Sequence, residues 1–170
     1  MTRTCRVLFS AIALAASAAA APPAPKADGW VAPDLDQLRK DAWRKGSPTA
    51  YARVKLDMDG DGLKDDAMLV THPVRHSSAL RICLASKNPQ APRNCHILGE
   101  VEDETGYEVM GLLVVAPGCH DYFALDDGTE VDGRFCTRTE VLDYFREGSA
   151  ASYYVYDRKT GTFNRYWYSD

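Results

Sequence analysis

The sequence has no run of basic residues, so it lacks the feature with which most proteins bind the phosphates of nucleic acids. Its 170 residues include 20 Lys and Arg against 24 Asp and Glu, a formal net charge of −4 at pH 7. An acidic chain without a basic segment argues against a nucleic-acid partner. A basic protein would be a suitable partner for such a chain.

The sequence also lacks the short motifs of several common enzyme classes. It contains no Gly-x-Ser-x-Gly, no phosphate-binding loop and no His-Glu-x-x-His, which mark serine hydrolases, nucleotide hydrolases and zinc peptidases. Pro73 lies between His72 and His76, so this pair cannot take the helical spacing of a zinc site. The acids at 100–104 could pair for glycoside hydrolysis, but a solvated acidic turn explains them more simply. We therefore expect a protein that is not an enzyme.

The apolar run near the N-terminus is too short for a convincing membrane span. It covers Val7–Ala16, follows Arg3 and Arg6, and is followed by small residues, which is the order typical of a secretory signal peptide. We predict a signal peptide over residues 1–20 and a soluble mature protein, periplasmic or secreted, without a membrane anchor. Loss of the two arginines moves the net charge from −4 to −6.

Cysteine is scarce, and one of the five residues, Cys5, lies in the predicted signal peptide. The other four are an even number in an exported domain, which implies two disulfides with three possible pairings. We favour Cys83–Cys95 and Cys119–Cys136, because both close short loops and would tie strand ends together. A metal site is the alternative, but the sequence has no Cys-x-x-Cys to support it.

Most of the mature chain consists of short segments with the alternation and composition of strands. These segments are Tyr51–Leu56, Ala67–Thr71, Leu80–Ala85, Cys95–Val101, Met110–Ala116, Thr139–Phe145, Tyr153–Tyr156 and Phe163–Tyr168. Short links between them predict a mainly β protein, either an antiparallel β-sandwich or a propeller-like sheet, with a short N-terminal helix over residues 34–45. We expect a flexible N-terminus and this helix over 21–47, and one β-domain over 48–170.

The segment from Asp57 to Asp66, Asp-Met-Asp-Gly-Asp-Gly-Leu-Lys-Asp-Asp, has the spacing of a cation-binding loop. Carboxylates at positions 1, 3, 5 and 9 with glycine at position 6 suit a hard cation, and Ca²⁺ is its natural occupant. Position 12 is Met68 instead of the glutamate of an EF-hand, and the flanks are predicted strands. A turn without metal is the alternative. The expected ligands are Asp57, Asp59, Asp61, the carbonyl of Leu63, and Asp65.

Two segments are candidates for partner binding. The segment Pro117–Phe135 is long for a connector, and a disulfide across its base would hold it ready for contact. The C-terminal residues are rich in tyrosine, and alternation would turn some of the rings toward solvent, although cross-strand packing also accounts for them. The residues that we expect at a partner surface are His120, Tyr122, Tyr154 and Tyr156.

The Asp-rich loop and the C-terminal sequence Ser-Tyr-Tyr-Val-Tyr-Asp-x-x-Thr-Gly-x-Phe-x-Arg-Tyr-Trp-Tyr-Ser-Asp resemble those of a group of exported bacterial proteins. The group includes FG-GAP/VCBS-like calcium-loop β-proteins and periplasmic lysozyme-inhibitor or immunity-type proteins. Over residues 48–170 the resemblance implies a calcium-stabilised, non-enzymatic β-domain that inhibits a basic cell-wall hydrolase. The alternatives are a hydrolase acting on cell wall or polysaccharide, and a structural protein.

Overall fold

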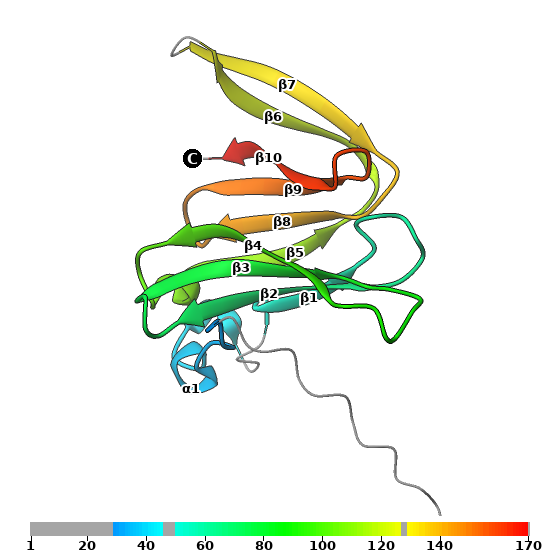
Figure 1. The fold of residues 1–170 in the computed structure, drawn as a ribbon. Coiled ribbons are helices and arrows are strands. Elements are labelled where there is room, and N and C mark those ends of the chain that lie inside the picture. Colours follow the sequence, from blue (N-terminus) through cyan, green and yellow to red (C-terminus); the bar gives the residue numbers. More distant parts are fainter. Residues whose placement is uncertain (1–28, 46–49, 127–128, 170) are drawn as a thin grey trace, which may run out of the picture.

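The structure is a computed structural model that describes residues 29–45, 50–126 and 129–169. Within these residues the chain forms ten strands in two antiparallel sheets, together with three short helical turns (Figure 1). The predicted mainly β, antiparallel sandwich is therefore confirmed. The predicted signal peptide lies outside the described residues. No helix in the described part is long and apolar enough to cross a membrane.

The first sheet has four strands in the order β1-β2-β3-β4, so each strand pairs with its neighbours in sequence. Its strands are β1 (Arg53–Leu56), β2 (Asp65–His72), β3 (Ser77–Leu84) and β4 (Asn94–Val101). The second sheet has six strands in the order β5-β8-β9-β10-β6-β7. Its strands are β5 (Met110–Val115), β6 (Gly118–Asp126), β7 (Thr129–Thr137), β8 (Val141–Arg146), β9 (Ala151–Asp157) and β10 (Thr162–Ser169).

The core lies between the four-stranded sheet and the β5–β8–β9 part of the other sheet. Alternate residues of each strand point inward, as the pleat of a strand requires. The fully or nearly buried members of this cluster are Leu38, Ala52, Leu56, Met58, Ala67, Leu69, Leu80, Ile82, Tyr107, Leu112, Leu142, Tyr144 and Tyr154. At one corner the segment just before β1 is joined to the second sheet, because the amide of Leu112 in β5 donates to the carbonyl of Tyr51 (2.7 Å).

The predicted helix over 34–45 is two separate turns. Residues Leu35–Leu38 form α1, and Ala42–Arg44 form a 3₁₀ turn, η1. A third turn, η2, covers Gly106–Glu108. The break lets both Leu38 and Arg44 enter the interior. Arg44 is 2% exposed, and its guanidinium donates to the carbonyls of Ala50, Tyr107 and Met110.

The prediction of an irregular connector over Pro117–Phe135 is wrong. This segment forms the hairpin of β6 and β7, paired in register from Gly118 opposite Thr137 to Asp126 opposite Thr129. The sequence did not indicate a strand here, because most side chains of β7 are exposed and apolar residues therefore do not alternate with polar ones. In Figure 1 this hairpin is the part of the molecule farthest from the four-stranded sheet.

Both predicted disulfides are present. Cys83–Cys95 joins β3 to β4, and Cys119–Cys136 joins β6 to β7 at the base of the hairpin. Each joins residues directly opposite in their strand pair, and together they indicate that the protein folds in an oxidising environment.

Candidate functional site

The turn between β1 and β2 brings three carboxylates together. One oxygen from each of Asp57, Asp59 and Asp61 lies within 4.8 Å of the other two. The turn curls because Gly60 and Gly62 take φ values of 71° and 85°, which favour glycine, and the amides of both donate to the Asp57 carboxylate (2.8 and 3.1 Å). A cluster of carboxylate oxygens with this spacing could hold a hard cation.

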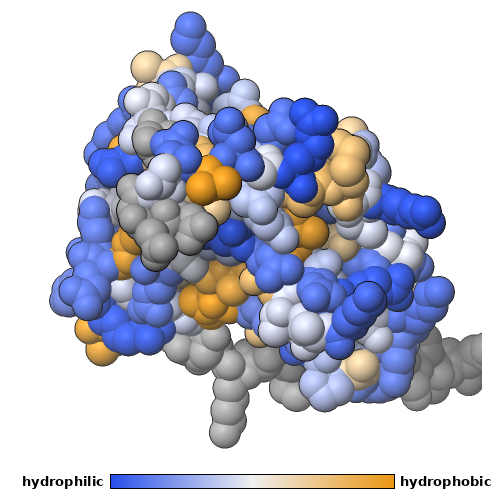
Figure 2. Space-filling model, turned by 90° about the horizontal axis from the view of Figure 1, so that it is seen from above, coloured by the Kyte–Doolittle hydropathy of each residue, from blue (hydrophilic) through white to orange (hydrophobic). Residues whose placement is uncertain are grey.

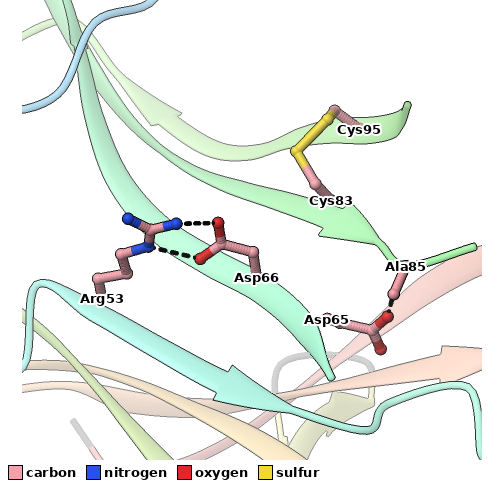
Figure 3. Close-up of a disulfide and its surroundings, with 6 residues drawn as sticks. All are labelled: Arg53, Asp65, Asp66, Cys83, Ala85 and Cys95. Atoms are coloured by element: carbon pink, nitrogen blue, oxygen red, sulfur yellow. Dashed lines mark hydrogen bonds and ion pairs between the residues drawn. A yellow bond between two sulfur atoms is a disulfide. The ribbon is translucent and has the colours of Figure 1, made fainter. Parts of the chain in front are cut away.

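Asp65 lies outside this group of three, and each of its carboxylate oxygens accepts a hydrogen bond from the backbone. Its side chain is buried, and it accepts from the amides of Met58 (2.9 Å) and Ala85 (2.8 Å). Burial raises the pKa of the carboxyl, although the two amides act in the opposite direction. Figure 3 shows Asp65 directed at Ala85. Asp65 therefore fastens the start of the loop to the end of β3.

The loop is also attached to the six-stranded sheet. Glu140, immediately before β8, accepts from the amide of Asp57 (2.6 Å) and from the ammonium of Lys64 (2.7 and 2.8 Å). Lys64 holds the pKa of Glu140 below its ordinary value, and the Asp57 amide adds to the effect. Leu63 donates its amide to Asp61 (2.8 Å). A change in the conformation of this loop would therefore be transmitted to both sheets, through Asp65 to the first and through Glu140 to the second.

The β6–β7 hairpin concentrates negative charge. Residues 118–137 contain five acids and one arginine, a net charge of −4, which equals that of the whole chain. Asp121 pairs with Arg134 across the two strands. Glu130 and Asp132 are exposed and have no ion-pair partner within the described residues. In Figure 2, which views the molecule from the hairpin end, hydrophobic side chains form small patches between hydrophilic ones.

The hairpin is attached to β9 and β10 by aromatic rings. Phe135 stacks on Tyr166 with ring centres 4.5 Å apart, and Tyr122 lies 4.8 Å from Tyr166. His120 and Phe135 contact Tyr153 at 5.2 and 5.8 Å. All five rings are half-buried. We call them the aromatic cluster, and we conclude that packing between the hairpin and β9–β10 accounts for much of their burial.

A glycine opposite Tyr122 makes this packing possible. A Cβ atom on Gly133 would lie 2.4 Å from the Tyr122 ring, which is far closer than any side chain tolerates. The Tyr122 ring therefore lies over the bare backbone of Gly133, and only glycine fits there.

The four residues predicted at a partner surface are not brought together. His120 and Tyr122 lie on β6 in the aromatic cluster. Tyr154 and Tyr156 lie on β9 and point to the opposite face: Tyr154 is 4% exposed in the core, and Tyr156 packs against Phe163 beside that core. Sequence alternation separates neighbouring residues by face but does not show which face is covered.

The other polar candidates have ordinary contacts. His72 packs edge-on against Trp30, and His76 lies 2.9 Å from the Glu104 carboxylate. In the acidic segment, Glu100 accepts from the Ser77 hydroxyl (3.0 Å) and Asp103 from the Thr105 amide (2.9 Å). The expected acidic turn at 100–104 is therefore correct only in part, because Glu100 lies in β4 and the turn begins after Val101.

Comparisons with known proteins give no relative. No family model, no curated protein and no solved structure matches this chain. The function must therefore be argued from the structure itself.

Proposed function

We propose that the protein is an exported, non-enzymatic binding protein that inhibits a basic cell-wall hydrolase in the periplasm. The observation that carries this proposal is the β6–β7 hairpin. It lies at the far end of the molecule from the four-stranded sheet (Figure 1), and its net charge of −4 equals that of the whole chain. A narrow acidic element of this kind is suited to a cleft lined by basic residues.

The base of the hairpin is held in two ways. The Cys119–Cys136 disulfide closes it at one point, and the aromatic cluster holds its inner part against β9 and β10. A hairpin held in one conformation loses less entropy on binding than a free loop. The exposed carboxylates of Glu130 and Asp132 would then meet a partner without prior ordering.

Calcium has a stabilising role in this proposal. We propose that Asp57, Asp59 and Asp61 bind one Ca²⁺, with any further oxygen ligands supplied by the loop backbone or water. The ion would neutralise three carboxylates that otherwise repel one another at the junction of β1 and β2. It would also order a loop that contacts both sheets through Asp65 and Glu140. Export by a signal peptide over residues 1–20 belongs to the same proposal and agrees with the two disulfides.

The test is inhibition of peptidoglycan hydrolysis by purified, oxidised protein. A panel of basic lysozymes and other wall hydrolases should include at least one that is inhibited at micromolar protein. The double variant Glu130→Lys with Asp132→Lys should inhibit at least about tenfold less, because like charges across an interface are repelled. The matched control is Glu102→Lys with Glu147→Lys, which makes the same charge change at exposed acids outside the hairpin.

Three results would count against the proposal. One is the absence of inhibition across the whole panel. Another is equal loss of inhibition in the hairpin variant and its control, which would indicate a general charge effect. The third is release of sugar fragments by the protein alone, which would identify it as a hydrolase.

A further inference from the structure

A cleft on the outer side of the four-stranded sheet collects positive charge. It lies between the edge strand β1 and the segment that follows β3, with a volume of about 360 Å³. Four cationic residues line it: Arg53, Lys55, Lys64 and Arg93. Figure 3 shows part of its wall, with Arg53 paired to Asp66 and the Cys83–Cys95 disulfide on the neighbouring strands.

The charges in this cleft do not cancel. Asp66 is the one carboxylate among the residues that line the cleft. The Arg53 guanidinium donates a hydrogen bond to each oxygen of the Asp66 carboxylate. Lys64 is held by Glu140 from outside the cleft. Lys55 and Arg93 have no ion-pair partner within residues 29–45, 50–126 and 129–169. The lining therefore has a net charge of +3 in a chain whose net charge is −4.

The wall formed by the segment after β3 is held in place. The Ala85 amide donates to buried Asp65 (2.8 Å), and the disulfide ties the end of β3 to β4. Farther on, the backbone amide of Asn88 donates to the Ser86 hydroxyl oxygen (3.2 Å), and the side-chain Oδ1 of Asn88 accepts from the backbone amide of Gln90 (3.0 Å). Asn88 also lines the cleft, and its side-chain NH₂ group can act as a neutral donor there.

We infer that this cleft binds a small molecule that carries a phosphomonoester group. An oxyanion with up to two negative charges would compensate the two unpaired cations, Lys55 and Arg93. Arginine binds such a group through two parallel hydrogen bonds and lysine as a point charge. The volume exceeds what a bare ion needs and falls within the lower range of small-molecule sites. This inference does not depend on the inhibitor role, because the cleft lies on the first sheet and the acidic hairpin on the second.

The test is calorimetric titration of the purified, oxidised protein in calcium-free buffer. The probes are glycerol 3-phosphate, inorganic phosphate, and glycerol as the uncharged control. A second arm measures sedimentation with vesicles containing phosphatidic acid, which presents the same group on a lipid. We expect saturable binding of glycerol 3-phosphate below about 1 mM and none of glycerol.

Two variants distinguish the cleft from general attraction. Lys55→Gln with Arg93→Gln should weaken binding by about tenfold for each charge removed. Lys87→Gln is the matched control, because Lys87 is exposed in the same segment but does not line the cleft, and it should bind like the wild type. Both altered side chains in the double variant are exposed, so the fold should be retained, which a thermal melt checks.

Each outcome decides the proposal. Binding of the free phosphomonoester that is lost in the double variant supports a soluble ligand, and binding only of the vesicles, lost in the same way, supports a lipid headgroup. Absence of binding in both arms overturns the inference. Binding that survives in the double variant, or that falls equally in Lys87→Gln, also overturns it.

Discussion

Trp167 of β10 lies opposite Phe123 of β6, and within the described residues this is the one backbone pair that joins the β6–β7 hairpin to the rest of its sheet. By contrast, β6 and β7 pair with each other over their full lengths. The hairpin is therefore a cooperative unit of its own, attached to β9 and β10 mainly by side chains. The aromatic cluster supplies most of that attachment, with Tyr166 contacting rings on both hairpin strands.

Tyr166→Ala should loosen the hairpin and leave the core intact. The variant loses two ring contacts, each worth about 0.5–1.5 kcal/mol beyond burial, so we expect the free energy of unfolding to fall by about 2 kcal/mol. Hydrogen exchange should become faster in residues 118–137 and stay unchanged in β2 and β3. Val131→Ala, an exposed change on the same hairpin, is the control. Equal acceleration in both sheets would show that the hairpin is not a separate unit.

Removal of either disulfide should lower the free energy of unfolding, but only removal of Cys119–Cys136 should affect the inhibition proposed above. The loops span 12 and 17 residues, and in the chain-entropy model each bond is worth about 3 kcal/mol. Cys119→Ser with Cys136→Ser should also weaken the proposed inhibition of a cell-wall hydrolase, because the base of the hairpin is released. Cys83→Ser with Cys95→Ser is the control of similar cost in stability, measured by urea unfolding beside the inhibition assay. If both pairs reduce inhibition alike, the hairpin is not the inhibitory element.

The fold could be predicted largely because buried strands have a recognisable pattern. In segments such as β2 and β3 most side chains are buried or half-buried, so these segments are rich in apolar residues that can be recognised in the sequence. The missed strands β6 and β7 belong to the exposed hairpin, where polar side chains on β7 and glycines such as Gly133 remove the alternation. Their pairing is instead stabilised by a disulfide and by rings from β9 and β10, and contacts of that kind come from distant parts of the sequence.

The cation loop could be predicted in part for a similar reason. The spacing of Asp57, Asp59 and Asp61 is local, and the structure does bring these three carboxylates together. The contact of Asp65 with Ala85 depends on where β3 ends, which spacing within the loop does not show. The cationic cleft joins residues from β1, β2 and the segment after β3, so no single stretch of sequence reveals it.

Calcium should raise the melting temperature of the protein, and the group of three aspartates should account for the rise. A ligand present at 100 times its dissociation constant adds about 2.7 kcal/mol, which corresponds to about 5–10 °C for a domain of this size. Asp59→Ala with Asp61→Ala should abolish the shift. Asp66→Ala is the control, since Asp66 pairs with Arg53 outside the group. An unchanged melting temperature in saturating calcium would refute a bound structural ion.

Asp143 of β8 should lower stability at neutral pH. It is 7% exposed, and its Oδ1 atom has no hydrogen-bond partner within the described residues. Burial raises the pKa of this carboxyl above its ordinary value of 3.8, although a hydrogen bond with Tyr168 acts in the opposite direction. A carboxyl with a raised pKa in the folded protein binds its proton more tightly there than in the unfolded chain. The contribution of Asp143 to the free energy of unfolding therefore rises as the pH falls through its pKa in the folded protein. The rise is complete below 3.8, the ordinary pKa that the carboxyl has in the unfolded chain.

Asp143→Asn removes this penalty and keeps an acceptor for the Tyr168 hydroxyl. At pH 7 we expect its free energy of unfolding to exceed that of the wild type by about 1 kcal/mol, the lower end of the cost of an unsatisfied buried group. The difference should shrink as the pH is lowered toward 3.8, where the wild-type carboxyl is itself protonated in the folded state. Urea unfolding at several pH values between 4 and 7 measures both effects. Glu102→Gln, an exposed change, should follow the wild type throughout, and a difference for Asp143→Asn that stays constant with pH would exclude titration of Asp143 as its cause.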